Sequence, residues 1–170
     1  MEEEILFAEK QKFNQWWLWI MLLAINVLFG LGIYKQVIGG QIFGDKPMSN
    51  NQIIIGAVGT LIVTILFLIF RLETIVKKDG IYVRFFPIHF AFRKYTWDKI
   101  DKSFIRKYNP IYEYGGWGLR MGLFGKGKAL NVSGNIGLQL ILSNKRSLLI
   151  GTNKSKELEK VLFEIGQLNK

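Results

Sequence analysis

The chain has 170 residues, of which 49% are hydrophobic, and its formal net charge at pH 7 is +10. This length allows one modest globular domain together with a membrane element. Because the chain has no cysteine, disulfides, iron–sulfur clusters and thiol chemistry are excluded.

Two uncharged segments follow a short N-terminal segment that covers residues 1–15. Their apolar parts, residues 16–34 and 53–70, are predicted to be transmembrane helices, because about 20 apolar residues in a helix cross the hydrocarbon core. Residues 35–52 link them. Buried helices of a soluble domain are the alternative. A cleaved signal peptide is disfavoured, because acidic residues precede the first segment and no small-x-small cleavage site follows it.

The distribution of Lys and Arg predicts the orientation of this helical hairpin. The chain after Phe70 has 19 Lys and Arg against 8 Asp and Glu, whereas the linker has only Lys35 and Lys46 against Asp45. Cytoplasmic flanks of membrane helices carry the excess of Lys and Arg. We therefore expect an integral protein of the bacterial inner membrane, with two spans, both termini cytoplasmic and the linker outside.

Three polar residues lie near the middle of the predicted helices, namely Asn26 in the first and Thr60 and Thr64 in the second. In an antiparallel hairpin they come level, and an amide within the membrane normally finds a partner. We expect a hydrogen bond from Asn26 to Thr60 or Thr64. Neither helix contains an ionisable side chain, which argues against an ion or proton pathway through the hairpin alone.

From Glu73 onward the pattern becomes that of β-strands. Asp79-Gly80 separates two β-branched and aromatic segments and is the strongest short hairpin signal in the chain. Eight extended segments are expected, over residues 74–78, 81–86, 89–95, 101–108, 117–120, 130–132, 138–142 and 148–150, and they should give a domain of about seven strands. An amphipathic helix should end the domain, since apolar residues recur at helical spacing at Leu158, Val161, Leu162, Ile165 and Leu168.

The resulting fold class is a membrane α-helical hairpin plus an α+β domain. About seven antiparallel strands followed by one helix resemble the pleckstrin-homology-like (PH-like) barrel. More narrowly, the chain resembles small bacterial membrane proteins that carry a bacterial PH-like domain behind a two-helix hairpin. The resemblance covers about residues 5–168. It rests on the segments Trp97-Asp98-Lys99-Ile100, Gly115-Gly116-Trp117-Gly118-Leu119-Arg120, Asn131-Val132-Ser133-Gly134-Asn135 and Leu149-Ile150-Gly151-Thr152. It implies a cytoplasmic PH-like domain over residues 71–170, and it implies no enzymatic activity.

Basic and apolar side chains in two loops are candidates for contact with the membrane or with anions. They are Lys77, Lys78, Arg120, Leu123, Phe124, Lys126 and Lys128. Cations beside an anionic leaflet are attracted by about 1 kcal/mol each. In eukaryotic PH domains the first turn often holds phosphoinositide-binding cations, but Lys77 and Lys78 match that turn only in being basic. A solvated basic face is the alternative.

Catalytic and cofactor sites are not indicated. Residues 122–128 match G-x-x-x-x-G-K, but Ala129 stands where a P-loop needs Ser or Thr for Mg²⁺, and the following residues read as a strand. His89 is the only histidine, and we expect it to be packed in the domain or at its surface. The cations are spread along the domain without an arginine cluster, so no nucleic-acid partner is expected.

These observations predict a membrane-tethered, non-catalytic PH-like module that uses its cytoplasmic face to contact a protein or the anionic membrane surface. An accessory structural subunit of a larger inner-membrane complex is the alternative. A protein partner is expected in either case, anionic lipid headgroups are a second candidate ligand, and no cofactor is expected.

Overall fold

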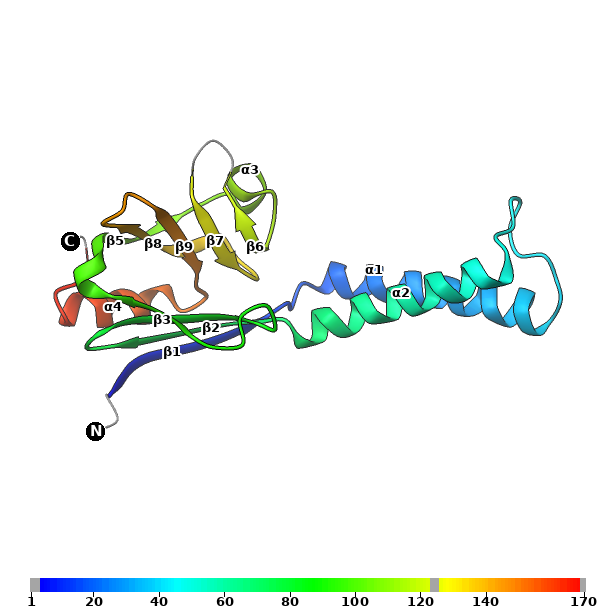
Figure 1. Cartoon of the computed structure of the whole chain (residues 1–170), viewed down its shortest axis with the longest axis horizontal. Coiled ribbons are helices and arrows are strands. Elements are labelled where there is room, and N and C mark those ends of the chain that lie inside the picture. The colour runs from blue at the N-terminus through cyan, green and yellow to red at the C-terminus, as the bar shows by residue number, and fades with distance from the viewer. Residues whose placement is uncertain (1–3, 123–125, 169–170) are drawn as a thin grey trace. The chain divides into compact units, whose positions relative to one another are not determined.

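The computed structural model describes residues 4–122 and 126–168 and divides the chain into two compact units (Figure 1). Unit 2 is Asn14–Ile69, and unit 1 comprises the residues up to Phe13 together with those from Phe70 onward. The two long helices and the α+β region expected from the sequence are thus confirmed.

Unit 2 is a pair of antiparallel helices. Its elements are α1 (Trp16–Gly32), the π-helical segment η1 (Ile33–Ile38) and α2 (Asn50–Ile69). By length and composition, both Trp16–Ile38 and Asn50–Ile69 are able to cross a membrane, and the first extends beyond its predicted end at Tyr34. The helices approach closely at Gly56, where a Cβ atom would lie 2.3 Å from the ring of Phe29. A larger residue at Gly56 would therefore push the helices apart.

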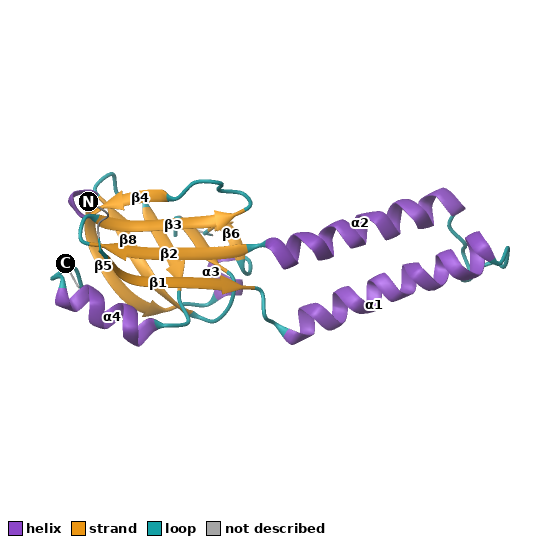
Figure 2. Ribbon diagram, turned by 90° about the horizontal axis from the view of Figure 1, so that it is seen from below, coloured by secondary structure: helices purple, strands orange, loops and turns teal. Residues whose placement is uncertain are grey.

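The first sheet of unit 1, sheet A, contains a strand that the sequence did not reveal. Its four strands are antiparallel in the order β1 (Ile5–Lys12), β2 (Arg71–Lys77), β3 (Gly80–Phe86) and β4 (Arg93–Thr96) (Figure 2). β1 comes from the segment before the helices and pairs with β2 along its whole length, from Ile5 opposite Lys77 to Lys12 opposite Arg71. The two strands that flank unit 2 in the sequence are therefore direct neighbours.

The second sheet, sheet B, has five strands in the order β5-β8-β9-β7-β6. Its strands are β5 (Ile100–Lys107), β6 (Gly118–Met121), β7 (Lys128–Asn131), β8 (Ile136–Leu142) and β9 (Ser147–Gly151). Two short helices belong to the same part of the chain, η2 (Trp97–Lys99) before β5 and α3 (Pro110–Tyr114) after it. All strand pairs were expected to be antiparallel, but β7 and β9 are parallel. The next strand in the chain after β7 is β8, yet β7 lies beside β9 in the sheet.

The expected C-terminal helix is confirmed as α4 (Ser155–Glu164), but it ends before Ile165 and Leu168, which the apolar spacing had placed in it. Its residues Leu158 and Leu162 are buried, and the helix contacts β1 and β8. The buried apolar side chains of both sheets and of α4 make up the core of unit 1, and a helix with an apolar stripe is suited to cover such a core. Its largest fully buried members include Leu72, Val83, Leu138, Leu140, Leu149 and Ile150.

The expected barrel is not closed. Among the described residues, strands pair only within each sheet, four in sheet A and five in sheet B. The chain passes from sheet A to sheet B at the corner between β4 and β5, where β4 ends at Thr96 and the 3-10 turn η2 follows. The Trp97 side chain is buried at this corner and donates a hydrogen bond to the Lys77 carbonyl oxygen (3.3 Å). The region is therefore an α+β unit of two sheets and one C-terminal helix.

Candidate functional site

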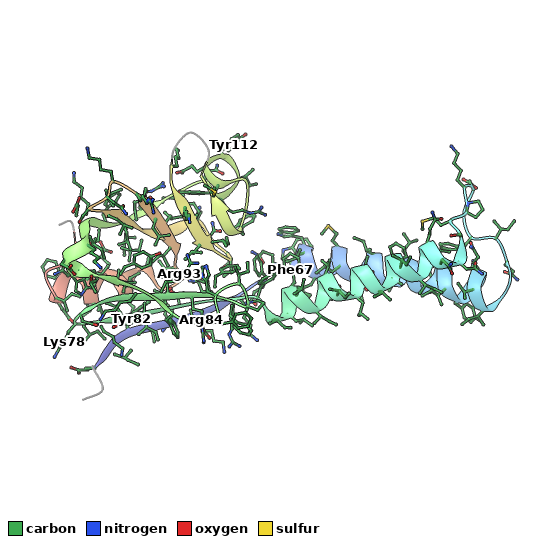
Figure 3. All side chains as sticks on the ribbon, in the orientation of Figure 1. Phe67, Lys78, Tyr82, Arg84, Arg93 and Tyr112 are labelled. Carbon is green, nitrogen blue, oxygen red and sulfur yellow. The ribbon has the colours of Figure 1, made fainter. Side chains whose placement is uncertain are left out.

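The predicted basic turn between β2 and β3 has its cations engaged within unit 1. The Lys78 ammonium lies 3.2 Å from a carboxylate oxygen of Glu4, and the Lys77 ammonium lies 5.3 Å from the centre of the Tyr82 ring. Because β2 begins at Arg71 and ends at Lys77, these lysines lie about 20 Å from Arg71, at the usual rise of a strand. Figure 3 shows Lys78 at this far end of the hairpin.

The same turn contains a compact polar cluster. Asp79 accepts a hydrogen bond of 2.5 Å from the Tyr82 hydroxyl and forms an ion pair with Lys94. The hydrogen bond to Asp79 is the main reason that the pKa of Lys94 and the pKa of Tyr82 are both raised above their usual values. Asp79 therefore offsets part of the positive charge at this end of the hairpin.

Two more of the predicted cations, Lys126 and Arg120, also have partners within unit 1. Lys126 and Arg106 both pair with the Glu113 carboxylate, at 3.3 and 2.9 Å. The pKa of Glu113 is lowered to about 2, mainly by the hydrogen bond that it accepts from Arg106. Arg120 donates a hydrogen bond from Nε to the Trp117 carbonyl oxygen (3.0 Å). Lys126 and Arg120 thus contribute to local structure around α3 and β6.

The remaining predicted contact residues lie elsewhere. Leu123 and Phe124 lie outside the described residues. Lys128 is the first residue of β7 and lines a cavity between β4 and sheet B. The described members of the predicted set therefore lie in separate parts of unit 1, the Lys77–Lys78 turn on sheet A and the others on sheet B.

In unit 2, Asn26 lies between two threonines of the facing helix. Its Nδ2 donates to Thr64 Oγ1 (2.8 Å) and to the Leu22 carbonyl oxygen (2.7 Å), and its Oδ1 accepts from Thr60 Oγ1 (3.3 Å). The amide is fully used inside the hairpin, so these residues serve helix–helix packing and leave no free polar group for a ligand.

A different feature stands out at the Arg71 end of sheet A. The loop after β3 exposes two apolar side chains, Ile88 (51% exposed) and Phe90 (77%), while His89 between them is buried. The His89 backbone N–H donates to the Phe85 carbonyl oxygen (2.8 Å), and its Nδ1 accepts a hydrogen bond from the Phe85 backbone N–H (3.3 Å). This pair of bonds holds His89 inward, and it thereby turns Ile88 and Phe90 outward.

Arginines lie over two half-buried aromatic rings beside these exposed side chains. The Arg71 guanidinium lies 4.5 Å from the centre of the Phe86 ring, and the Arg84 guanidinium lies 4.5 Å from that of Phe92. Arg84 also donates to the Phe90 carbonyl oxygen (3.2 Å). Figure 3 shows Arg84 on sheet A, away from Lys78. We call this group the aromatic–arginine patch; its members are Arg71, Arg84, Phe86, Ile88, Phe90 and Phe92.

One carboxylate holds the two arginines of the patch in place. Glu73 lies 3.0 Å from Arg71 Nε and accepts a hydrogen bond of 2.6 Å from Arg84 Nε. In the sheet, Glu73 is directly opposite Arg84, and Arg71 is opposite Phe86. The guanidinium groups are thus fixed above aromatic rings by cross-strand pairing, an arrangement in which cation–π and ion-pair contacts support each other.

The sequence pattern predicts a strand over residues 89–95, whereas β4 covers only Arg93–Thr96. Alternating aromatic residues at Phe90 and Phe92 imitate a strand pattern, but the bonds between His89 and Phe85 fold this segment into a turn. The signal that could have revealed an exposed apolar loop is Pro87 directly before Ile88, because proline ends regular strand pairing.

No family model and no curated protein gives a significant match to the chain.

Proposed function

We propose that this chain is a membrane-tethered, non-catalytic PH-like module of the bacterial inner membrane, and that its basic unit 1 rests on the anionic cytoplasmic leaflet through the aromatic–arginine patch. The observation that carries the proposal is the position of the patch. It lies at the end of sheet A where the chain leaves β1 and enters β2, next to both helix connections.

Chain connectivity limits how far this end of sheet A can lie from the helices. Only Phe70 separates the end of α2 at Ile69 from the start of β2 at Arg71. Successive Cα atoms are 3.8 Å apart, so Arg71 stays within about 8 Å of the last helical residue. If α2 crosses the bilayer, Arg71 lies close to the level where the helix emerges, which is where aromatic and cationic side chains are favoured.

The pairing of β1 with β2 supports two crossings and a common side for both flanks. Residues 5–12 and 71–77 are hydrogen-bonded neighbours, so they occupy the same side of any membrane that the helices span. The excess of Lys and Arg in unit 1 then favours the cytoplasmic side. The PH-like assignment is supported by the order of the elements, with two sheets and one C-terminal helix, and the parallel β7–β9 pair departs from it.

The energies of such a contact are sufficient to hold the patch at the interface. Burial of an exposed Ile or Phe side chain in apolar surroundings contributes about 1.5–3 kcal/mol. Each cation beside an anionic leaflet contributes about 1 kcal/mol. Ile88 and Phe90 would insert, while Lys12, which is opposite Arg71 in the sheet, adds a further charge next to the patch.

Orientation can be measured with single cysteines, because the chain has none of its own. We expect Asp45→Cys, in the loop between the helices, to react with a membrane-impermeant maleimide in intact spheroplasts. Phe163→Cys, exposed on α4, should react only after the cells are permeabilised. Labelling in the reverse order would contradict the cytoplasmic placement of unit 1.

The contact itself can be tested in the full chain, reconstituted in vesicles that contain phosphatidylglycerol. A bimane label on Phe90→Cys should be quenched strongly by lipids with a spin label near the headgroup. The same label on Lys78→Cys, exposed at the opposite end of the same hairpin, is the matched control and should be quenched at least threefold less. Equal quenching at both positions would overturn the proposal.

A protein partner gives a different result in the same system. If the aromatic–arginine patch docks on a membrane protein, the Phe90→Cys label stays unquenched by lipid in vesicles of the purified chain, and purification in mild detergent recovers a stoichiometric partner. That outcome would favour the accessory-subunit function over the leaflet contact.

A further inference from the structure

A second candidate site lies in unit 1 and is lined by residues that do not belong to the aromatic–arginine patch. A cavity of about 800 Å³ opens where the edge strand β4 faces sheet B. β4 contributes Arg93 and Tyr95, β7 contributes Lys128, and the hairpin between β8 and β9 contributes Lys145 and Arg146. Its volume lies in the range of pockets that hold small organic ligands.

The charge of this cavity has one sign. Arg93, Lys128, Lys145 and Arg146 line it, and no Asp or Glu does so among the residues that the structure describes. Within the same described part of the chain, none of these four side chains forms an ion pair, whereas neighbouring Lys126 is neutralised by Glu113. Converging cations without a counter-charge repel one another, and an anion in the cavity would relieve this repulsion.

The surroundings of His89 agree with a positive field in this region, and Lys145 has an unusual backbone conformation. The pKa of buried His89 is lowered, first by burial and then by the charges of Arg93 and Lys128. Lys145 has a φ angle of +61°, a left-handed conformation that is unfavourable for a residue with a Cβ atom. A basic side chain is thus present at a hairpin position that favours glycine.

The rest of the lining restricts the kind of anion. Tyr95, Leu142 and Leu148 contribute apolar surface beside the cations. Guanidinium groups bind phosphate oxygens in a bidentate manner, and lysine adds a point charge. A bare inorganic ion would leave most of the cavity volume and all of the apolar surface unused.

From this juxtaposition we propose that the cavity binds a phosphate ester of small-molecule size, with the phosphate held by Arg93 and Lys128 and the organic part against Tyr95 and Leu148. The phosphate ester comes either from an anionic lipid headgroup or from a soluble metabolite. This site does not depend on the proposed contact between the aromatic–arginine patch and the bilayer, because it is formed within unit 1 by other residues.

The test uses the full chain in a neutral detergent and 4-methylumbelliferyl phosphate as the probe, with binding measured by equilibrium dialysis. We expect saturable binding of the probe and at least tenfold weaker binding of phosphate-free 4-methylumbelliferone. The double variant Arg93→Gln/Lys128→Gln should weaken probe binding at least tenfold. Both side chains are exposed, so the thermal unfolding of this variant should match that of the parent chain.

A charge-matched control separates the cavity from general electrostatics. Lys102→Gln/Lys156→Gln removes the same charge from exposed positions outside the cavity lining, and probe binding should change less than twofold. If Arg93→Gln/Lys128→Gln does not fold, Lys145→Gln/Arg146→Gln in the β8–β9 turn replaces it with the same expectation. Equal losses in cavity and control variants, or equal binding of the two umbelliferyl compounds, would overturn the proposal.

Competition distinguishes the two sources of the phosphate ester. Displacement of the probe by dihexanoylphosphatidylglycerol at concentrations where inorganic phosphate has no effect indicates a lipid headgroup. Displacement by inorganic phosphate, with no greater effect of the short-chain lipid, indicates a soluble phosphate compound. If neither displaces the probe, phosphate recognition is contradicted.

Discussion

Replacement of Phe7 by alanine is expected to lower the free energy of unfolding of unit 1 by about 3–4 kcal/mol, a loss typical of large-to-small changes in a core. Phe7 lies on β1, far in sequence from the strands that it helps to cover, and only 2% of its surface is exposed. The loss can be measured by urea unfolding of the full chain in detergent, followed by near-ultraviolet circular dichroism.

The polar neighbours of Phe7 explain why β1 belongs to unit 1. Glu9 accepts hydrogen bonds from Thr152 Oγ1 (2.6 Å) and from the Asn153 backbone N–H (2.9 Å), and Gln11 donates to the Gly151 carbonyl oxygen (2.7 Å). These groups are buried and paired across more than a hundred residues of sequence, and breaking such bonds leaves unsatisfied polar atoms. A fragment that starts at residue 71 lacks this strand and should unfold far more readily.

Lys10→Ala is the matched control for Phe7→Ala. Lys10 is on the same strand but its side chain is exposed, so the change should alter stability by no more than about 0.5 kcal/mol. Equal effects of the two substitutions would show that β1 is not part of the core in solution.

Gly127→Ala is expected to cost about 3–5 kcal/mol, because backbone strain and a steric clash act together at this position. Gly127 has a φ angle of +81°, and a Cβ atom there would lie 2.1 Å from the Ser147 carbonyl oxygen. The clash falls where β7 begins to pair with β9, at Lys128 opposite Leu148. Relief requires the two parallel strands to separate. Thermal unfolding and amide hydrogen exchange of β7 and β9 would both report it.

Gly115→Ala separates strain from clash. Gly115 also has a positive φ angle, +69°, but no atom lies within 4 Å of the position that its Cβ would occupy. Only the conformational cost should remain, about 1–2 kcal/mol. If Gly115→Ala is as harmful as Gly127→Ala, then the contact with Ser147 does not decide the outcome.

Local patterns in the sequence were enough to predict the elements that depend on local contacts. The Asp79-Gly80 turn gives the β2–β3 hairpin, with Gly80 at φ +154° and no room for a Cβ beside the Tyr95 carbonyl oxygen. The apolar spacing around Leu158 and Leu162 gives α4, and the long uncharged segments give α1 and α2.

The features that were missed depend on partners distant in sequence. β1 turns Phe7, Glu9 and Gln11 inward, and two of these three residues are polar, so no apolar alternation marks it. Gly127 resembled part of a defective phosphate-binding motif, whereas its role is to let β7 approach Ser147. The cavity takes its residues from both sheets, and no spacing along the chain brings Arg93 to Lys128.

The pairing of β1 with β2 also has a consequence for biosynthesis. β1 leaves the ribosome before either helix, yet its hydrogen-bonding partner is made only after α2. If the helices span the membrane, unit 1 can close only when both have inserted and the chain has returned to its starting side. A chain with one helix misplaced would keep β1 and β2 on opposite sides, with their edges unpaired and open to proteolysis. In that case, the β1–β2 pair forms only in chains whose two helices have both inserted.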